Sequence, residues 1–163
     1  YRARQTFHVE SDRLQVCLSL ENLEARDVPA GLGLHPFFVR DPDSELRCRT
    51  GAVWHVDTEV LPTKRTTVPP AWEFSESRRI ESVVLDNCFE DWDGRAEIVW
   101  PSRGLALAME ASPPFRHLVI FTPPGRPYFC VEPVSHASGR LGATRLAAGA
   151  MLDGQIVFRP YNP

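Results

Sequence analysis

Residues 14–20 read LQVCLSL, which places Leu14, Val16, Leu18 and Leu20 on one side of an extended chain. This alternation has the two-residue period of a strand that buries one face. The same period, or an enrichment in β-branched and aromatic residues, predicts further strands at 30–39, 44–49, 52–60, 95–100, 104–110, 117–122, 128–133 and 150–159. No segment keeps apolar residues at the helical period over three turns. The sequence therefore predicts an all-β fold, as a sandwich or a barrel.

Turn-forming residues separate these strands. The chain has 15 prolines in 163 residues, roughly twice the usual share of about 5%, and proline interrupts the interior of a helix. Residues 61–85 are predicted to form a long loop with one helical turn near Ser77–Ser82, and loops of that length are usually functional. Two hairpins are predicted, pairing 96–100 with 105–110 and 117–122 with 128–133.

Composition excludes several classes of protein. The length predicts one domain over residues 1–163. A net charge of −3 and a pI near 6.0 give no basic surface for nucleic acid, and no apolar run approaches the roughly 20 residues that cross a bilayer.

The four cysteines, Cys17, Cys48, Cys88 and Cys130, form no CxxC pair, so zinc-ligand spacing is absent. We interpret them as reduced, buried thiols of a cytoplasmic protein, with a disulfide pair as the alternative.

The segment GLGLHPFF, residues 31–38, is the first candidate for a functional site. As a strand it places Gly31, Gly33, His35 and Phe37 on one face. Two glycines leave bare backbone beside an imidazole, and such backbone marks close approach by a ligand or by another chain segment. The alternative is a β-bulge with a hydrogen-bonded, partly buried histidine.

The segment YFCVEP, residues 128–133, is the second candidate. Tyr128, Cys130 and Glu132 share one face of the predicted strand. A glutamate in such an apolar run is costly to bury, and burial raises its pKa towards neutrality, which suits a general base. The alternative is an edge-strand glutamate that faces solvent. His35 and Glu132 each precede a proline, which favours a stiff, extended backbone at both positions.

The segment LDNCFEDWDG, residues 85–94, is the third candidate. Asp86, Asp91 and Asp93 surround Trp92. Carboxylates accept hydrogen bonds from sugar hydroxyls, and an indole stacks on the C–H face of a sugar ring. The oxygen spacing does not match a calcium loop, and no metal site is predicted. The alternative is an acidic surface turn.

In this order, the three segments resemble the aldose 1-epimerase (galactose mutarotase) family, whose fold is a β-supersandwich. LPT at 61–63, VEPVSH at 131–136 and the closing stretch GATRLAAGAMLDGQIVF at 142–158 extend the match over nearly the whole chain. The resemblance implies an enzyme that interconverts the α and β anomers of a free hexose. A base removes the proton of the anomeric hydroxyl while an acid protonates the ring oxygen, and the opened ring closes again on the other face. It implies no metal, nucleotide or other cofactor.

The resemblance also implies roles for individual residues. His35 aligns with the acid, Glu132 with the base, and Asp86 with a carboxylate that binds sugar hydroxyls. The residue types agree with these roles. The ordinary pKa of a histidine is about 6.5, and burial raises the pKa of a glutamate towards that value. Each such group contributes about 10²–10⁴-fold to a rate.

Three further residues are predicted to bind the substrate. Trp92 is expected to stack on the sugar, Phe37 lies on the face of His35, and His136 follows Glu132 by four residues and could hydrogen-bond it. His55 and His117 are predicted to be surface residues.

Other functions stay open at this stage. A hexose-6-phosphate 1-epimerase needs cations for the phosphate, which could come from Arg40, Lys64, Arg65, Arg78 and Arg79. A non-catalytic carbohydrate-binding sandwich would depend on Trp92, Asp86 and Trp72 instead of an acid–base pair. A structural β-sandwich without a ligand is the third alternative.

The chain departs from the family at its start. The family places a second histidine and a substrate-binding arginine ahead of the histidine–proline segment, whereas only 34 residues precede His35 here and the chain begins YRAR without methionine. We therefore interpret it as the C-terminal portion of a longer mutarotase-like chain, truncated at the N-terminus. Missing strands would leave unpaired edges and apolar faces. We expect the chain to dimerise, or to hold a separate N-terminal segment, through those edges.

Overall fold

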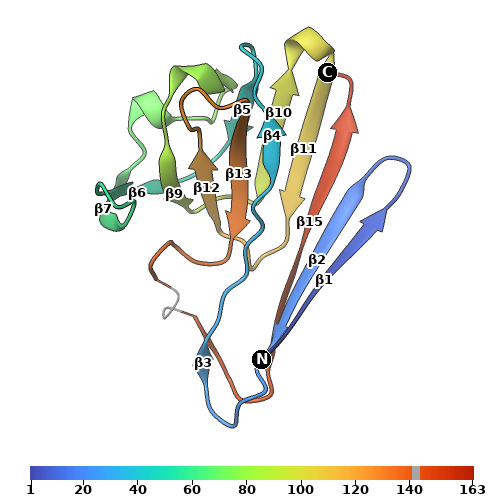
Figure 1. Ribbon diagram of the computed structural model, residues 1–163, viewed down its shortest axis with the longest axis vertical. Helices are drawn as coiled ribbons and strands as arrows, with labels where there is room; N and C mark the ends of the chain where they lie inside the picture. Colours follow the sequence, from blue (N-terminus) through green and yellow to red (C-terminus); the bar gives the residue numbers. More distant parts are fainter. Residues whose placement is uncertain (141–143) are drawn as a thin grey trace.

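Strands dominate the computed structural model, which describes residues 1–140 and 144–163 (Figure 1). The described residues form no α-helix, which confirms the predicted all-β fold, and none of their short helical turns could cross a membrane. The strands are β1 (Arg2–Val9), β2 (Leu14–Glu21), β3 (Val28–Pro29), β4 (Phe37–Val39), β5 (Glu45–Cys48), β6 (Ala52–Val56), β7 (Pro62–Thr67), β8 (Arg78–Arg79), β9 (Asp86–Glu90), β10 (Arg95–Trp100), β11 (Leu105–Ala111), β12 (His117–Phe121), β13 (Tyr128–Val134), β14 (Arg145–Leu146) and β15 (Met151–Tyr161). Three 3-10 turns connect them: η1 (Pro70–Trp72), η2 (Ile80–Ser82) and η3 (Pro101–Arg103).

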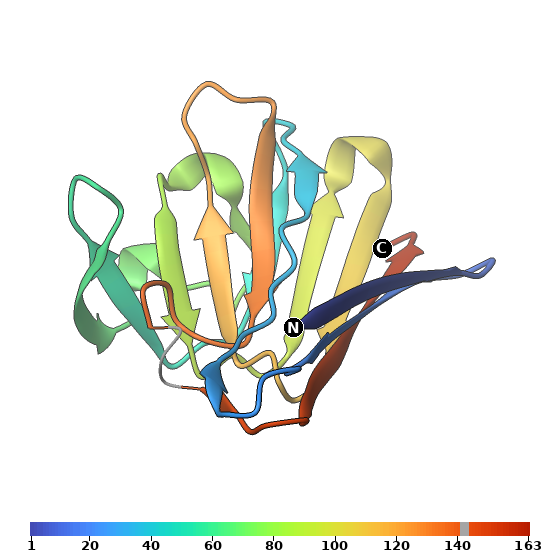
Figure 2. The ribbon, with the colours of Figure 1, turned by 60° about the horizontal axis from the view of Figure 1, so that its bottom comes forward.

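Two antiparallel sheets face each other (Figures 1 and 2). The seven-stranded sheet has the order β1-β2-β15-β11-β10-β5-β8, and the six-stranded sheet has the order β4-β13-β12-β9-β6-β7. The short strands β3 and β14 pair separately. Figure 2 shows that the β1–β2 hairpin reaches away from the six-stranded sheet.

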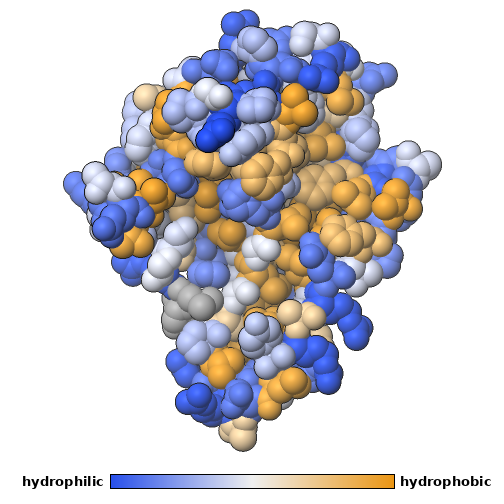
Figure 3. Space-filling model, viewed as in Figure 1, coloured by the Kyte–Doolittle hydropathy of each residue, from blue (hydrophilic) through white to orange (hydrophobic). Residues whose placement is uncertain are grey.

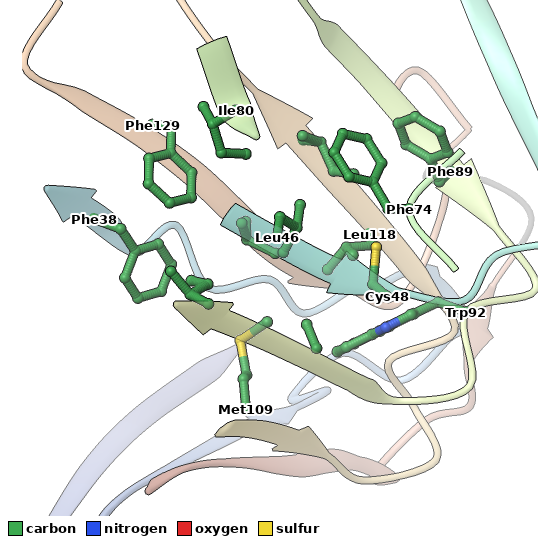
Figure 4. Packing of buried hydrophobic residues seen from close by; sticks show 14 of the residues in the cluster. Phe38, Leu46, Cys48, Phe74, Ile80, Phe89, Trp92, Met109, Leu118 and Phe129 are labelled. Atoms are coloured by element: carbon green, nitrogen blue, oxygen red, sulfur yellow. The ribbon is translucent and has the colours of Figure 1, made fainter. Parts of the chain in front are cut away.

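The core lies between the two sheets (Figure 4). Ile98 and Met109 enter it from the seven-stranded sheet, and Phe89, Leu118 and Phe129 enter it from the six-stranded sheet. All five side chains are fully buried, and each such side chain contributes about 1.5–3 kcal/mol of transfer free energy. The outward face of the six-stranded sheet carries a second, smaller apolar cluster that includes Trp54, Cys88 and Val119.

The alternating segments fold as predicted. Residues 14–20 lie in β2 with Val16 buried. Both hairpins form, with Trp100 opposite Leu105 in one and Phe121 opposite Cys130 in the other. All four cysteines are free thiols, and three are buried: Cys48, Cys88 and Cys130. Gly142 and Ala143, which begin the closing stretch, lie outside the described residues.

Two segments predicted to be loops contain strands. Residues 61–85 include β7 and β8, although the helical turn expected there is present as η2. Residues 86–90 form β9, an inner strand of the six-stranded sheet, and not an acidic turn. Asn87, Cys88 and Phe89 are buried in succession, so the alternation that marks a half-buried strand is missing. The predicted strand 52–60 ends at Val56, because Asp57 closes a turn by accepting hydrogen bonds from the N–H groups of Glu59 and Leu61.

An apolar face of the β1–β2 hairpin is exposed (Figure 3). Phe7 and Val9 are 59% and 80% exposed, and β1 is the edge strand of its sheet. A groove of about 430 Å³ runs beside this face, lined chiefly by Val9, Leu14, Pro36, Phe38, Leu107 and Phe158. Association through this edge, with a second copy or another segment, stays a prediction.

A substitution in β15 tests the packing of the seven-stranded sheet. A Cβ at Gly154 would lie 2.7 Å from Cε2 of the fully buried Phe115 and 3.1 Å from Oγ of Ser112. Gly154→Ala is therefore expected to lower the free energy of unfolding by about 1–2 kcal/mol, measured by denaturant titration. Adding Phe115→Leu should recover part of this loss in a double-mutant cycle. A Gly154→Ala protein as stable as the wild type would contradict the packing.

Candidate active site

His35 and Glu132 lie in contact on the outward face of the six-stranded sheet. Nε2 of His35 is 3.2 Å from Oε1 of Glu132. Glu132 is on β13, and His35 precedes β4, the neighbouring edge strand. The imidazole is 53% exposed, whereas the Glu132 side chain is only 11% exposed. The structure therefore brings the predicted acid and the predicted base together, with the imidazole on the open side.

Backbone hydrogen bonds fix His35 beside β13. The N–H of Leu34 donates to the carbonyl of Pro133 at 3.0 Å, and the N–H of Ser135 donates to the carbonyl of Leu32 at 2.9 Å. The N–H of Leu32 donates in turn to Oγ of Ser135 at 2.8 Å. These bonds join the residues that precede His35 to the residues that follow Glu132, so the backbone sets the separation of the two side chains.

The predicted strand 30–39 is correct only for residues 37–39. Pro36 has no N–H to donate, and residues 31–36 make isolated hydrogen bonds and one bridge, between Gly33 and Val134, in place of a continuous ladder. A Cβ at Gly33 would lie 3.1 Å from Cγ1 of Val134. The bare backbone at Gly33 therefore admits the neighbouring strand and not a ligand.

Burial changes the pKa of the Glu132 carboxyl group. Burial, and secondarily the charge of Asp86, raise the pKa of Glu132 to about 7. Burial also raises the pKa of Asp86, against the opposing charge of His35. A carboxyl group with a pKa near 7 exchanges its proton readily at neutral pH, which is what a general base requires.

Asp86 lies on the same face as the pair. Phe121 of β12 is paired with Asp86 of β9 on one side and with Cys130 of β13 on the other. Asp86 is thus two strands away from the strand of Glu132, a lateral distance of about 10 Å. Phe121 lies between the two strands at this register.

Phe37 stacks on the imidazole of His35. The two rings are 4.8 Å apart with an angle of 15° between their planes, and Tyr128 packs edge-on against Phe37 at 5.1 Å. Phe37 is 62% exposed although it is aromatic. The stack orients the imidazole, and the exposed ring borders the space above Glu132.

The prediction that Trp92 stacks on a sugar is wrong. Trp92 is 1% exposed and belongs to the main core cluster, and Figure 4 shows its indole among the core side chains. Its Nε1–H donates to the carbonyl of Arg95 at 2.8 Å. The indole is thus fully engaged inside the sandwich and has no face free for a ligand.

The prediction that His136 hydrogen-bonds Glu132 is also wrong for the described residues. Nδ1 of His136 lies 3.3 Å from Oγ of Ser135, and no hydrogen bond joins its ring to Glu132. Burial lowers the pKa of His136. Its charge acts on His117, which is paired with Val134 at the nearby end of β13.

A second polar cluster on this face centres on Glu90 and was not predicted. The carboxylate accepts a hydrogen bond from Nε1 of Trp54 at 2.6 Å and another from Nε of Arg65. Burial alone would raise the pKa of Glu90, but the hydrogen bonds from Arg65 and Trp54 outweigh it and lower the pKa. Arg140 stacks over the Trp54 ring at 4.3 Å. These partners come from separate strands, so no local sequence signal marks the cluster.

His117, predicted to be a surface residue, is half-buried within this cluster. Its Nε2 lies 3.7 Å from Oε1 of Glu90, and burial lowers its pKa. Its Nδ1 is buried without a hydrogen-bond partner among the described residues. His55, the other predicted surface histidine, is partly buried, with its Nε2 2.9 Å from Oγ1 of Thr66.

Comparisons with known proteins identify the family and the fold. The sequence model of the aldose 1-epimerase family matches residues 1–145. The uncharacterized protein YphB of Escherichia coli K12 is 31% identical over 145 residues, which cover 84% of this chain and 50% of that protein. A crystal structure of a putative aldose 1-epimerase from Escherichia coli K12 superposes with a TM-score of 0.89 at 29% identity, over 100% of this chain and 62% of that one. A galactose mutarotase-like protein from Clostridium acetobutylicum gives a TM-score of 0.85 at 19% identity, over 98% of this chain and 55% of that one.

The matches cover most or all of this chain but only part of each relative. The chain spans about half the length of the curated relative and less than two thirds of either solved structure. The sheets match those of galactose mutarotase-like folds. The family match covers most of the chain, and its fold agrees. The chain therefore belongs to the aldose 1-epimerase family.

Proposed function

We propose that this protein interconverts the α and β anomers of a free hexose by general acid–base ring opening. The observation that carries the proposal is the contact of 3.2 Å between His35 Nε2 and Glu132 Oε1. One partner is exposed to an incoming sugar and the other is a buried carboxyl group with a raised pKa. Membership of the aldose 1-epimerase family supports the same reaction class.

The reaction follows from the two positions. The Glu132 carboxylate removes the proton of the anomeric hydroxyl while protonated His35 donates a proton to the ring oxygen. The bond between C1 and the ring oxygen breaks, and the hydroxyl oxygen becomes the carbonyl oxygen of the open aldehyde. After rotation about C1–C2, His35 takes back the proton of the ring-oxygen hydroxyl as this oxygen attacks C1, and Glu132 returns its proton to the carbonyl oxygen. The net change is only the configuration at C1.

The remaining site residues bind the sugar in this proposal. Asp86 accepts hydrogen bonds from sugar hydroxyls, two strands away from Glu132. Phe37 offers an exposed ring beside the reacting carbon, and aromatic rings pack well on sugar C–H faces. Partial burial of both carboxyl groups strengthens hydrogen bonds to the ligand, because the local dielectric is low.

The pH profile tests the role of Glu132. Because the pKa of Glu132 is about 7 and the base must be ionised, kcat/KM is expected to fall about tenfold per pH unit below that value. The measurement is polarimetry of freshly dissolved α-D-glucose, with the uncatalysed rate subtracted at each pH. A flat profile from about pH 5 to 8 would contradict general-base catalysis by Glu132.

A variant of Asp86 sharpens this test. The charge of Asp86 helps to raise the pKa of Glu132, so in Asp86→Asn the acid limb of kcat/KM should move to lower pH. A simple loss of sugar binding would lower kcat/KM at every pH and leave the limb in place. The two effects are separated by the midpoint of the limb.

A phosphorylated substrate is less favoured, because three of the five cations that could hold a phosphate are already paired. Arg65 is paired with Glu90 and Asp91, and Arg40 donates to the carbonyl of Pro123 at 2.6 Å and pairs with Glu81 at 3.2 Å. Arg78 is occupied by backbone carbonyls. Comparing turnover of glucose with that of glucose 6-phosphate separates the two substrates, and faster turnover of the phosphate would overturn the proposal.

A non-catalytic sugar-binding role is also less favoured. Its expected aromatic platform is lost, because Trp92 is buried in the core and Trp72 is partly buried against His55, with ring centroids 5.2 Å apart. Sugar binding in calorimetry without anomer interconversion would reverse this conclusion.

A further inference from the structure

We propose that His35, Cys130 and Glu132 together bind a thiophilic divalent cation such as Zn²⁺, and that the bound cation inhibits the enzyme. The inhibitory effect rests on the function proposed above, whereas the binding does not. Among the described residues these are the side chains that bring three potential ligand atoms of different kinds to one point.

The geometry is close to that of a tetrahedral site. The imidazole nitrogen, the thiol sulfur and a carboxylate oxygen all lie within 4.8 Å of one another, and the nitrogen and oxygen are 3.2 Å apart. Metal–ligand bonds of about 2.0–2.3 Å place tetrahedral ligand atoms about 3.3–3.8 Å from each other. A contraction of about 1 Å, within reach of side-chain rotation, therefore completes three corners of the tetrahedron.

The ligand types select the metal. Thiolate, imidazole and carboxylate are the donors that Zn²⁺ takes in proteins, whereas Mg²⁺ and Ca²⁺ take oxygen donors. The nearby carboxyl group of Asp86, whose charge acts on both Glu132 and Cys130, adds favourable negative potential. Three protein ligands leave the fourth position to water or to a sugar oxygen.

Access and proton balance are also consistent with binding. The imidazole of His35 is 53% exposed and provides the entry side, while Cys130 forms the buried floor. Burial, then the charges of Glu132 and Asp86, raise the pKa of the Cys130 thiol to about 12. The cation must therefore displace the thiol proton to solvent as the metal–sulfur bond forms. Binding is best measured at mildly alkaline pH.

The consequence for catalysis is direct. A cation bound here occupies the lone pair of His35 and an oxygen of Glu132 at the same time. Neither group can then carry a proton to or from the sugar. Removal of the cation by a chelator restores both groups, so the inhibition is reversible.

Cobalt provides the test, because a thiolate bound to Co²⁺ gives a charge-transfer absorption in the near ultraviolet. Titration of the reduced protein with Co²⁺ is expected to produce this band, saturating at one ion per chain, and Zn²⁺ should abolish it by displacement. Cys130→Ser should lose the band. The matched control is Cys88→Ser, which removes another buried thiol of the same sheet face and should keep it.

The possible results separate the two proposals. No band, or a band that survives Cys130→Ser and disappears in Cys88→Ser, overturns the metal site. His35→Ala should weaken Co²⁺ binding at least tenfold, and unchanged binding also overturns it. A band in a protein without anomerase activity supports the metal site and contradicts the proposed function. Activity that Zn²⁺ leaves unchanged at concentrations saturating the band overturns the inhibition.

Discussion

Replacing Glu132 with glutamine is expected to lower kcat for anomer interconversion by about 10²–10⁴-fold. The amide has nearly the shape of the carboxyl group but cannot take a proton from the anomeric hydroxyl. His35→Ala should produce a loss of similar size, because the ring oxygen then leaves without a proton donor. Polarimetry at a pH close to 7, the pKa of Glu132, measures both losses.

Glu90→Gln is the matched control for this loss. Glu90 is a partly buried glutamate on the same sheet, but its partners are Trp54 and Arg65 and not His35. Its replacement should leave kcat within a few-fold of wild type. If Glu132→Gln and His35→Ala both keep the wild-type rate, the assignment of the catalytic pair is wrong.

The same Glu132→Gln protein is expected to be more stable than the wild type at alkaline pH. The folded protein raises the pKa of Glu132 from 4.5 to about 7, so folding binds the proton and disfavours the ionised form. Stability from this group is fully present below the unfolded pKa and is lost as pH rises to the folded pKa. A shift of about 2.5 units, at about 1.36 kcal/mol per unit, corresponds to up to about 3 kcal/mol. Glutamine carries no such charge and escapes this penalty.

Denaturant unfolding at about pH 4 and about pH 8 measures the difference. The variant and the wild type should have similar free energies of unfolding at the lower pH and should diverge at the higher one. Glu90→Gln should behave oppositely, because folding lowers the pKa of Glu90 and its ionised form is stabilised. Equal stability of wild type and Glu132→Gln at both pH values would contradict the burial of a charged base.

Much of the fold is readable from alternation and turn residues. The strand at residues 14–20 and both hairpins form where a period of two predicts them. In the first of these, Leu14, Val16 and Leu18 pack in or against the core. His35 and Glu132 were identifiable because each interrupts an apolar segment and precedes a proline. Their contact distance was not, since it depends on a pairing between the end of β13 and residues far away in the chain.

The errors have a common physical origin in contacts between distant segments. In β9, Asn87 can be buried because its amide donates to the carbonyl of Trp54 on the neighbouring strand. A residue type that is typical of turns therefore lies inside a strand. Trp92 sits between two aspartates, yet its indole turns inward and finds a carbonyl partner. His117 is half-buried beside Glu90, which comes from another strand. The partners of Asn87 and His117 lie far away in the sequence. The carbonyl partner of Trp92 is only three residues away, and it is the burial of the indole in the core that depends on distant segments.

The arrangement of the site also bears on how such proteins diversify. The proposed acid and base occupy adjoining segments at one edge of the six-stranded sheet, held by backbone bonds, while Asp86 lies on a separate strand further in. In the proposed function, substitutions on β9 would alter the binding of sugar hydroxyls without moving the backbone that holds the acid and the base. A change at Asp86 would in addition shift the pKa of Glu132, so a lineage that changes its sugar at this position also changes its pH optimum. The same separation tells a protein engineer where to place a selectivity library.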